Sequence, residues 1–133
     1  MSYLESAKEL YENKLVADVT KVADDKLLIS FNESNNKLKL IADTGCICDV
    51  SWFEFFPETG YEYMIGRRIT RIYVSKDVIE LPLSGKQECD DNKIIIVEFS
   101  DGTEFKFILR NSSNGYYSGF LHIELVDADG NRI

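Results

Sequence analysis

Residues 45–55 (GCICDVSWFEF) and residues 115–125 (GYYSGFLHIEL) align without a gap, and this doubled stretch decides the predicted fold. A glycine opens both stretches, Glu54 aligns with Glu124, and apolar residues occupy the same alternating positions in each. Alternation with a period of two is typical of a half-buried β-strand. We therefore predict that the two stretches are equivalent strands of an internal repeat.

The segments upstream of these strands match as well. Residues 26–31 (KLLISF) resemble residues 94–99 (IIIVEF), and a turn-forming sequence follows each of them. The pattern predicts two related halves, at about residues 13–56 and 63–126, within a single domain spanning residues 1–133. Each half alone would leave an apolar sheet face uncovered, so we expect the halves to pack around one interior.

Helical periodicity is confined to the N-terminus. Ser2 followed by Glu5 is a capping-box signal, and apolar residues recur at helical spacing over residues 3–12. Residues 27–31 and other segments alternate as strands do, and residues 69–74 are also predicted to form a strand. The polar, acidic residues 84–92 are predicted to form a loop. The fold class is therefore α+β, mostly antiparallel β-sheet with one N-terminal helix.

The composition of the chain excludes some classes of function. The chain has 133 residues, a net charge of −8 and a pI of about 4.6, which argues against binding nucleic-acid phosphates. It contains no apolar run long enough for a membrane span and no basic, then apolar, N-terminal signal, so we expect a cytoplasmic protein without membrane contact. No cofactor is expected, and unpaired strand edges favour a homodimer.

The three cysteines, Cys46, Cys48 and Cys89, are predicted to be free thiols. Together with Asp49 and His122 they could in principle ligate a metal. A zinc site normally has two close ligand pairs, whereas this chain has one. Packing as small apolar side chains is the favoured interpretation, and no metal site is predicted.

Acid–base chemistry would depend on His122, the sole histidine, with Glu54 and Glu124. His122 aligns with Trp52 of the first half. No nucleophile motif accompanies the histidine, so the favoured interpretation is structural and no catalytic residue is assigned.

The segment around Asn114 and Gly115 is the preferred binding candidate. An Asn-Gly pair suits a tight turn, and the adjacent Tyr116 and Tyr117 would point to opposite faces of a strand. Arg110 could neutralise an anionic ligand or pair with a neighbouring acid. Trp52 and His122 complete the predicted ligand-binding set.

Residues 113–118 (SNGYYS) also resemble a motif of a family of small uncharacterised bacteriophage and bacterial proteins. The resemblance covers roughly residues 10–125, and the family implies a phage or bacterial source and a β-rich fold. Further matching pieces are a cysteine pair, an aromatic-acidic stretch, a short apolar stretch and a hairpin, at residues 46–48, 52–54, 64–66 and 94–109.

Three functions remain open from the sequence. The first is a non-enzymatic phage or bacterial accessory protein that engages a host protein. The second is a protein that sequesters a small molecule or nucleotide through Tyr116, Tyr117 and Arg110. The third is an enzyme using His122 with Glu54 and Glu124.

Overall fold

The computed structural model describes residues 3–44, 50–77, 79, 81–82, 84–85, 89–113 and 119–133. Within these residues the elements, in chain order, are α1 (Tyr3–Ser6), the 3₁₀-helix η1 (Ala7–Leu10), β1 (Val16–Ala23), β2 (Lys26–Phe31), β3 (Ser34–Asp43), β4 (Val50–Phe55), the 3₁₀-helix η2 (Tyr61–Met64), β5 (Ile69–Val74), β6 (Cys89–Phe99), β7 (Glu104–Ser113) and β8 (Phe120–Val126).

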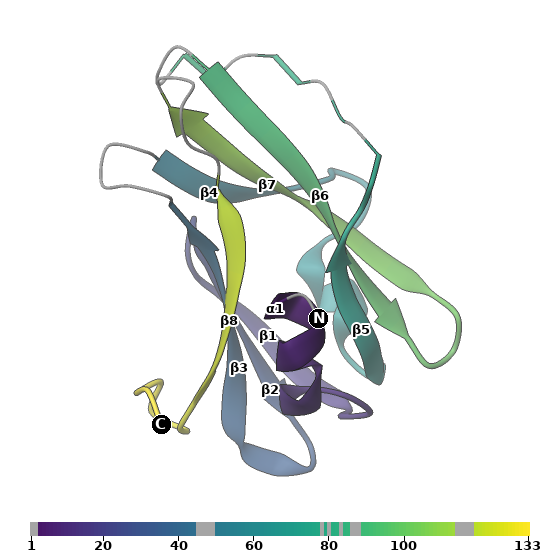
Figure 1. The fold of residues 1–133 in the computed structure, drawn as a ribbon. Helices are drawn as coiled ribbons and strands as arrows, with labels where there is room; N and C mark the ends of the chain where they lie inside the picture. The colour runs from purple at the N-terminus through teal and green to yellow at the C-terminus, as the bar shows by residue number, and fades with distance from the viewer. Residues whose placement is uncertain are drawn as a thin grey trace.

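The strands form two four-stranded sheets, in the orders β1-β2-β3-β8 and β4-β7-β6-β5, and all of the pairings are antiparallel. Each sheet is a three-stranded meander completed by a fourth strand from the other half of the chain (Figure 1). The prediction of a mostly antiparallel β fold with a short N-terminal helix is confirmed. The relationship between the halves remains a prediction.

Strands β4 and β8, each of which joins the meander of the other half, bury alternate residues in the interior in the same way. Ser51 and Phe53 are buried on β4, as Leu121 and Ile123 are on β8, while the residues between them are partly exposed. This pattern arises because one face of each strand covers the core and the other faces outward. The predicted starts of both strands fall on residues 45–49 and 114–118, which lie outside the described residues.

A turn held by two backbone hydrogen bonds, which we call a joint, precedes each three-stranded meander. After η1, the N–H of Asn13 donates to the carbonyl of Ile69 at 2.8 Å, and the N–H of Ile69 donates to the carbonyl of Lys14 at 3.2 Å. Asn13 adopts a φ of 63°, in the left-handed region that asparagine tolerates better than most residues. The turn ties the N-terminal helix to the first residue of β5.

The second joint has the same pattern. After η2, the N–H of Gly66 donates to the carbonyl of Val16 at 2.9 Å, and the N–H of Val16 donates to the carbonyl of Arg67 at 2.9 Å. Gly66 has a φ of 84°, which glycine adopts without steric cost. Each helical turn is thus fastened to the first strand of the other meander.

Both sheets contribute to one interior. Leu27, Ile29 and Leu40 from the first sheet and Val97 and Phe107 from the second belong to the same buried cluster. The two layers therefore cannot separate without exposing the apolar surface that stabilises both.

The N-terminal helix is shorter than the predicted 3–12. One α-helical turn and one 3₁₀ turn end at Leu10, because Tyr11 leaves the helical conformation, with φ −134°, and turns its ring into the core. Of the helices that the structure describes, none has the length and apolar character needed to cross a membrane.

The predicted loop at 84–92 is partly wrong, since β6 begins at Cys89. Asp90 pairs with Ser112 and Asn92 with Arg110 in the ladder between β6 and β7. The polar side chains that suggested a loop are compatible with a strand because they have hydrogen-bonding partners on this sheet.

Candidate functional site

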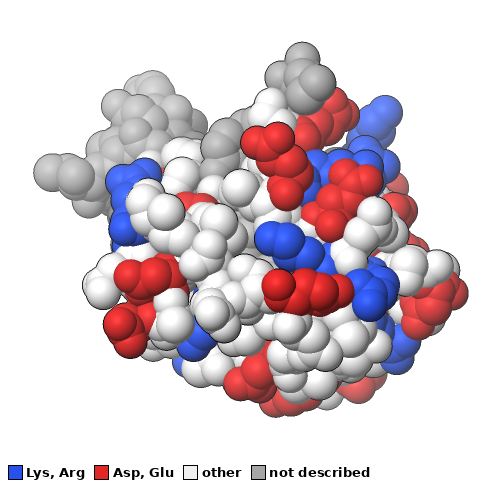
Figure 2. Space-filling view, turned by 90° about the horizontal axis from the view of Figure 1, so that it is seen from below, with Lys and Arg blue, Asp and Glu red and all other residues white. Residues whose placement is uncertain are grey.

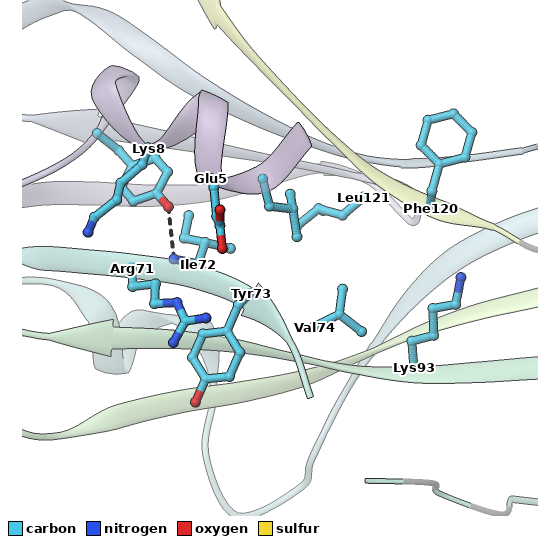
Figure 3. Close-up of a pocket in the computed structure, with 11 residues that line it drawn as sticks. Glu5, Lys8, Arg71, Ile72, Tyr73, Val74, Lys93, Phe120 and Leu121 are labelled. Atoms are coloured by element: carbon cyan, nitrogen blue, oxygen red, sulfur yellow. Dashed lines mark hydrogen bonds between the residues drawn. The ribbon is translucent and has the colours of Figure 1, made fainter. Parts of the chain in front are cut away.

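A cavity of about 880 Å³ lies between the N-terminal helix, β5 and the start of β8 (Figure 3). Its apolar lining comes from Leu4 on the helix, Ile72 and Val74 on β5, and Leu121 on β8. Phe120 also lines the cavity and is 47 % exposed, so an aromatic ring is accessible to solvent there. Pockets for small molecules typically have volumes of about 300–1,000 Å³ and mainly apolar walls.

Tyr11 forms part of the wall and is fully buried. Its hydroxyl accepts a hydrogen bond of 2.9 Å from the N–H of Ile72 (Figure 3). Burial raises the pKa of Tyr11, although the Ile72 N–H acts in the opposite direction, so the hydroxyl is neutral at physiological pH.

Three cations and one acid line the same cavity: Lys8, Arg71, Lys93 and Glu5. This ratio inverts the balance of the whole chain, in which 23 acidic residues outnumber 15 basic ones. The view in Figure 2 shows Lys and Arg intermixed with Asp and Glu over one face of the molecule, without a continuous basic stripe. Cations outnumber acids among the lining residues, while Lys8 also lies 3.9 Å from Glu12 and Lys93 lies 3.7 Å from Asp91.

Lys93 connects the cavity wall to the start of β8. Its ammonium donates to the carbonyl of Gly119 at 2.7 Å and lies 3.7 Å from the Asp91 carboxylate. A Cβ on Gly119 would lie 2.7 Å from the Ser51 hydroxyl oxygen, so glycine permits the close approach of the chain here. The cavity wall at β8 is held by these contacts.

Arg110 lies outside this cavity, in a buried ion-pair network on β7, which belongs to the same sheet as β5. Its guanidinium donates to Asn92 at 3.1 Å, to Glu54 at 3.0 Å, and to both the Pro82 carbonyl and Asp90 at 2.7 Å. The Arg110 side chain is 8 % exposed and that of Asp90 is 2 % exposed. Of the two predicted roles for Arg110, pairing with neighbouring acids is the one that this geometry favours.

Asp90 is the most buried acid of the network. Its carboxylate accepts hydrogen bonds from the N–H of Ser84 at 2.7 Å and from the Ser84 hydroxyl at 3.0 Å. Burial raises the pKa of Asp90, but the Ser84 hydrogen bonds and the Arg110 charge outweigh it and place the pKa below its ordinary value. Asp90 is therefore ionised at neutral pH and fastens the chain around Ser84 to the sheet.

Trp52 belongs to the same network. Its indole N–H donates to Glu54 at 3.2 Å, and the Arg110 guanidinium lies 5.4 Å from the centre of its ring. Trp52 and Arg110, both predicted as ligand-binding residues, are thus neighbours, but in an arrangement in which the cation already has protein partners.

His122 and Glu124 lie on β8, with Nε2 of the histidine 3.4 Å from the Glu124 carboxylate, which is also 3.5 Å from Arg132. Glu54 lies on β4 of the other sheet. All three side chains alternate with the inward-facing residues of their strands, so they occupy the outer faces of different layers. The arrangement does not support one catalytic site that contains all three.

Several predicted residues lie outside the described residues: Asn114, Gly115, Tyr116, Tyr117, and the cysteines 46 and 48. Among the residues that are described, no group of three or more His, Cys, Asp or Glu side chains is placed to hold a metal ion.

Sequence reasoning missed the cavity. Its walls come from three separate segments that contain Leu4, Val74 and Phe120, with Lys93 as a fourth contributor. The one signal available was the basic cluster at residues 67, 68 and 71 within an acidic chain, because Lys93 follows an acidic stretch. The sequence does not show that the fold brings Arg71 and Lys93 to the same cavity.

The fold and the cavity define a small two-sheet β protein with a site of ligand size. No family model matches the chain, and no solved structure matches it. It is 38 % identical over 122 residues to the uncharacterised protein L278 of Acanthamoeba polyphaga mimivirus, which covers 90 % of this chain and 94 % of the viral protein. The chain belongs to the same family as this giant-virus protein.

This relationship corrects the predicted membership in a bacteriophage and bacterial family, which is wrong. The prediction depended mainly on the short motif at residues 113–118. Asn, Gly, Ser and Tyr are common in turns and adjoining strands, so such a motif can recur without common descent.

Proposed function

We propose that the protein binds an elongated apolar molecule that carries one anionic group, in the cavity between the N-terminal helix, β5 and β8. The observation that carries this proposal is an apolar cavity of about 880 Å³ with three cations and one acid on its walls, in a chain of net charge −8. The apolar body would contact Leu4, Ile72 and Leu121, and burying that surface would supply most of the affinity.

The anionic group would lie near Lys93, one of three cations at the cavity. Lys93 is partly exposed, and its Gly119 contact holds the ammonium at the cavity. A charged hydrogen bond adds more to binding than a neutral one, and it selects an acid over an uncharged molecule of equal length.

Isothermal titration calorimetry with decanoate, decan-1-ol and acetate tests the proposal. We expect decanoate to bind in the micromolar range, decan-1-ol at least tenfold more weakly, and acetate not measurably. The Lys93→Met variant should lose about tenfold for decanoate and little for decan-1-ol, corresponding to about 1.4 kcal/mol. Lys106→Met, an exposed lysine away from this cavity, is the matched control. Absence of decanoate binding to the unaltered protein would reject the proposal.

Engagement of a partner protein is a second candidate. Phe120 is a large aromatic side chain that is 47 % exposed beside the cavity, and exposed aromatic residues are enriched at protein interfaces. A pull-down with the unaltered protein and with Phe120→Ser tests this candidate, which fails if both return the same proteins. Formation of a homodimer also stays a proposal, and analytical ultracentrifugation tests it.

We also propose that the two halves arose by internal duplication. Support comes from the matching joints at Asn13 and Gly66. It also comes from a second matched pair, in which the Lys14 ammonium lies 5.6 Å from the Phe31 ring centre and the Arg67 guanidinium 6.0 Å from that of Phe99. Superposition of the two meanders tests the proposal, which fails if these residues do not coincide.

A further inference from the structure

Strand β5 has one edge that β6 does not cover. Alternate residues of an antiparallel strand direct their N–H and C=O groups to the same side. The N–H of Ser75 donates to the carbonyl of Ile94 at 2.8 Å, whereas the N–H of Ile72 donates to the Tyr11 hydroxyl. The carbonyl of Ile72 and both backbone groups of Val74 therefore point away from β6, to the side on which Tyr11 lies.

This edge is covered over part of its length. At its start Ile69 is paired with Asn13 and Lys14, and at Ile72 a side-chain hydroxyl takes the place of a neighbouring strand's carbonyl. Val74 follows and lines the cavity. The edge thus changes from protected to open along its own length.

The open part of the edge faces a wall suited to apolar side chains. In Figure 3, Val74 on β5 lies across from Leu121 and Phe120 on β8, with Lys93 near the same end. An extended chain beside β5 would occupy the space about 4.8 Å from it and direct alternate side chains to either face. Donors, acceptors and apolar surface are therefore presented together.

The charged residues of the cavity indicate which end of an extended chain would bind there. Lys93 lies at the end of the cavity beyond Val74, whereas Lys8 and Arg71 lie at the opposite end (Figure 3). A carboxylate complements the Lys93 ammonium, and a chain terminus combines a carboxylate with an extended backbone and apolar side chains.

We propose that the occupant is the apolar carboxy-terminal segment of another protein, which adds as a strand to the free edge of β5 beside Val74. This inference deepens the proposed function and rests on it. Strand addition obtains affinity from main-chain hydrogen bonds and specificity from the pockets that receive alternate side chains.

Calorimetry with a peptide series tests the main-chain contacts. The first probe is acetyl-Leu-Val-Leu-Val with a free carboxylate. Two further peptides of the same sequence are N-methylated at every second amide, one at the first set of alternate positions and one at the other set. The remaining probes are the carboxy-terminal amide of the peptide and decanoate. We expect N-methylation in one register to weaken binding at least tenfold and in the other less than threefold, while amidation weakens it about fivefold. Equal binding of both N-methylated peptides would overturn the inference.

A backbone variant tests the site on the protein. Val74→Pro removes an N–H that points away from β6, so the ladder between β5 and β6 keeps its hydrogen bonds. We expect it to lose peptide binding at least tenfold. Val74→Ala, which keeps the N–H, is the matched control and should lose less than threefold. Equal peptide affinity of Val74→Pro and Val74→Ala contradicts strand addition, and the peptide series decides the matter if the proline variant does not fold.

Comparison of decanoate binding with peptide binding distinguishes failure of this inference from failure of the proposed function. Binding of decanoate without binding of the peptide overturns the strand-addition inference and leaves the proposed function standing. Failure of both probes to bind rejects both proposals.

Discussion

The molecule has two flanks, the β1–β4 flank beside η2 and the β5–β8 flank beside η1. The two flanks are built alike, but the gap between the strands is closed on the first and open on the second. A short helical turn precedes each meander, η1 on one flank and η2 on the other, and each turn places one fully buried side chain, Tyr11 or Met64, in the core. Beside η2, the N–H of Phe53 on β4 donates directly to the carbonyl of Asp24 after β1, at 2.8 Å. Beside η1, a cavity lies between β5 and β8.

The difference between Met64 and Tyr11 suggests how one of two similar flanks can acquire a binding site. A methionine fills an irregular apolar space and needs no hydrogen-bond partner. A buried tyrosine needs a partner for its hydroxyl, and Tyr11 finds it at the edge of β5. The helix on that flank thereby occupies the space beside a strand edge and leaves volume beyond it. We infer that the β1–β4 flank is the structural one and the β5–β8 flank the functional one.

Arg110→Met should have the largest effect, because it removes the cation from the ion-pair network on β7. The variant leaves Asp90 as a buried charge without its cation, and breaking a buried ion pair costs about 4 kcal/mol. Urea unfolding followed by circular dichroism measures this loss. Arg132→Met, which removes an exposed arginine that lies 3.5 Å from Glu124, is the control and should change stability by less than about 0.5 kcal/mol. Similar stabilities of the two variants would contradict a stabilising role of the Arg110 network.

Met64→Ala tests the closed flank directly. Removing a buried methionine leaves a cavity and should cost about 3 kcal/mol. The comparison is Leu4→Ala on the open flank, where the side chain is partly exposed and already borders a cavity, so the cost should be about 1 kcal/mol. The contrast between the flanks fails if Leu4→Ala is the more damaging of the two changes in thermal unfolding.

Asp90 makes the stability of the network depend on pH. Its pKa in the folded protein lies below its ordinary value, so its contribution is complete above the unfolded pKa of about 3.9 and is lost as the pH falls through the lower, folded value. Asp90→Asn should cost about 2 kcal/mol at pH 7, since hydrogen bonds to a charged group are lost. The difference from the unaltered protein should shrink from pH 4 downwards in urea titrations. Asp91→Asn, at a neighbouring acid whose side chain is 43 % exposed, is the control variant.

Tyr11→Phe should have the smallest effect on stability, about 1 kcal/mol, because it removes one hydrogen bond and keeps the ring. Hydrogen exchange measured by NMR provides the sharper readout. We expect the Ile72 amide to exchange faster in the variant while the amide of Val97, its pairing partner on β6, stays protected. Unchanged exchange at Ile72 would mean that Tyr11 does not protect this edge.

The elements could be predicted from the sequence where the cause is local. Alternation of Leu27, Ile29 and Phe31 predicted the strand that is β2. The Asp-Gly pair at 101–102 marks the turn between β6 and β7, where Gly102 has a φ of 85°. The exchange of β4 and β8 between the sheets was not predicted, because alternation gives the buried face of a strand and not its neighbour.

The site was less predictable than the fold. Arg110 was identified as a residue of interest, but its partners Asp90 and Glu54 are distant in sequence, so the choice between a ligand and a neighbouring acid stayed open. The cavity depends on where an N-terminal helix meets the edges of two sheets. Nothing in the local pattern around Val74 or Phe120 indicates that these residues face one another.

The binding claim is tested most directly by mapping decanoate onto the protein with backbone amide shifts in NMR spectra. We predict that the largest changes occur at Ile72, Val74 and Leu121, and that they saturate with a single binding constant. Changes concentrated around Arg110 and Trp52 instead, or none at millimolar decanoate, would contradict the assignment of the β5–β8 flank as the functional one.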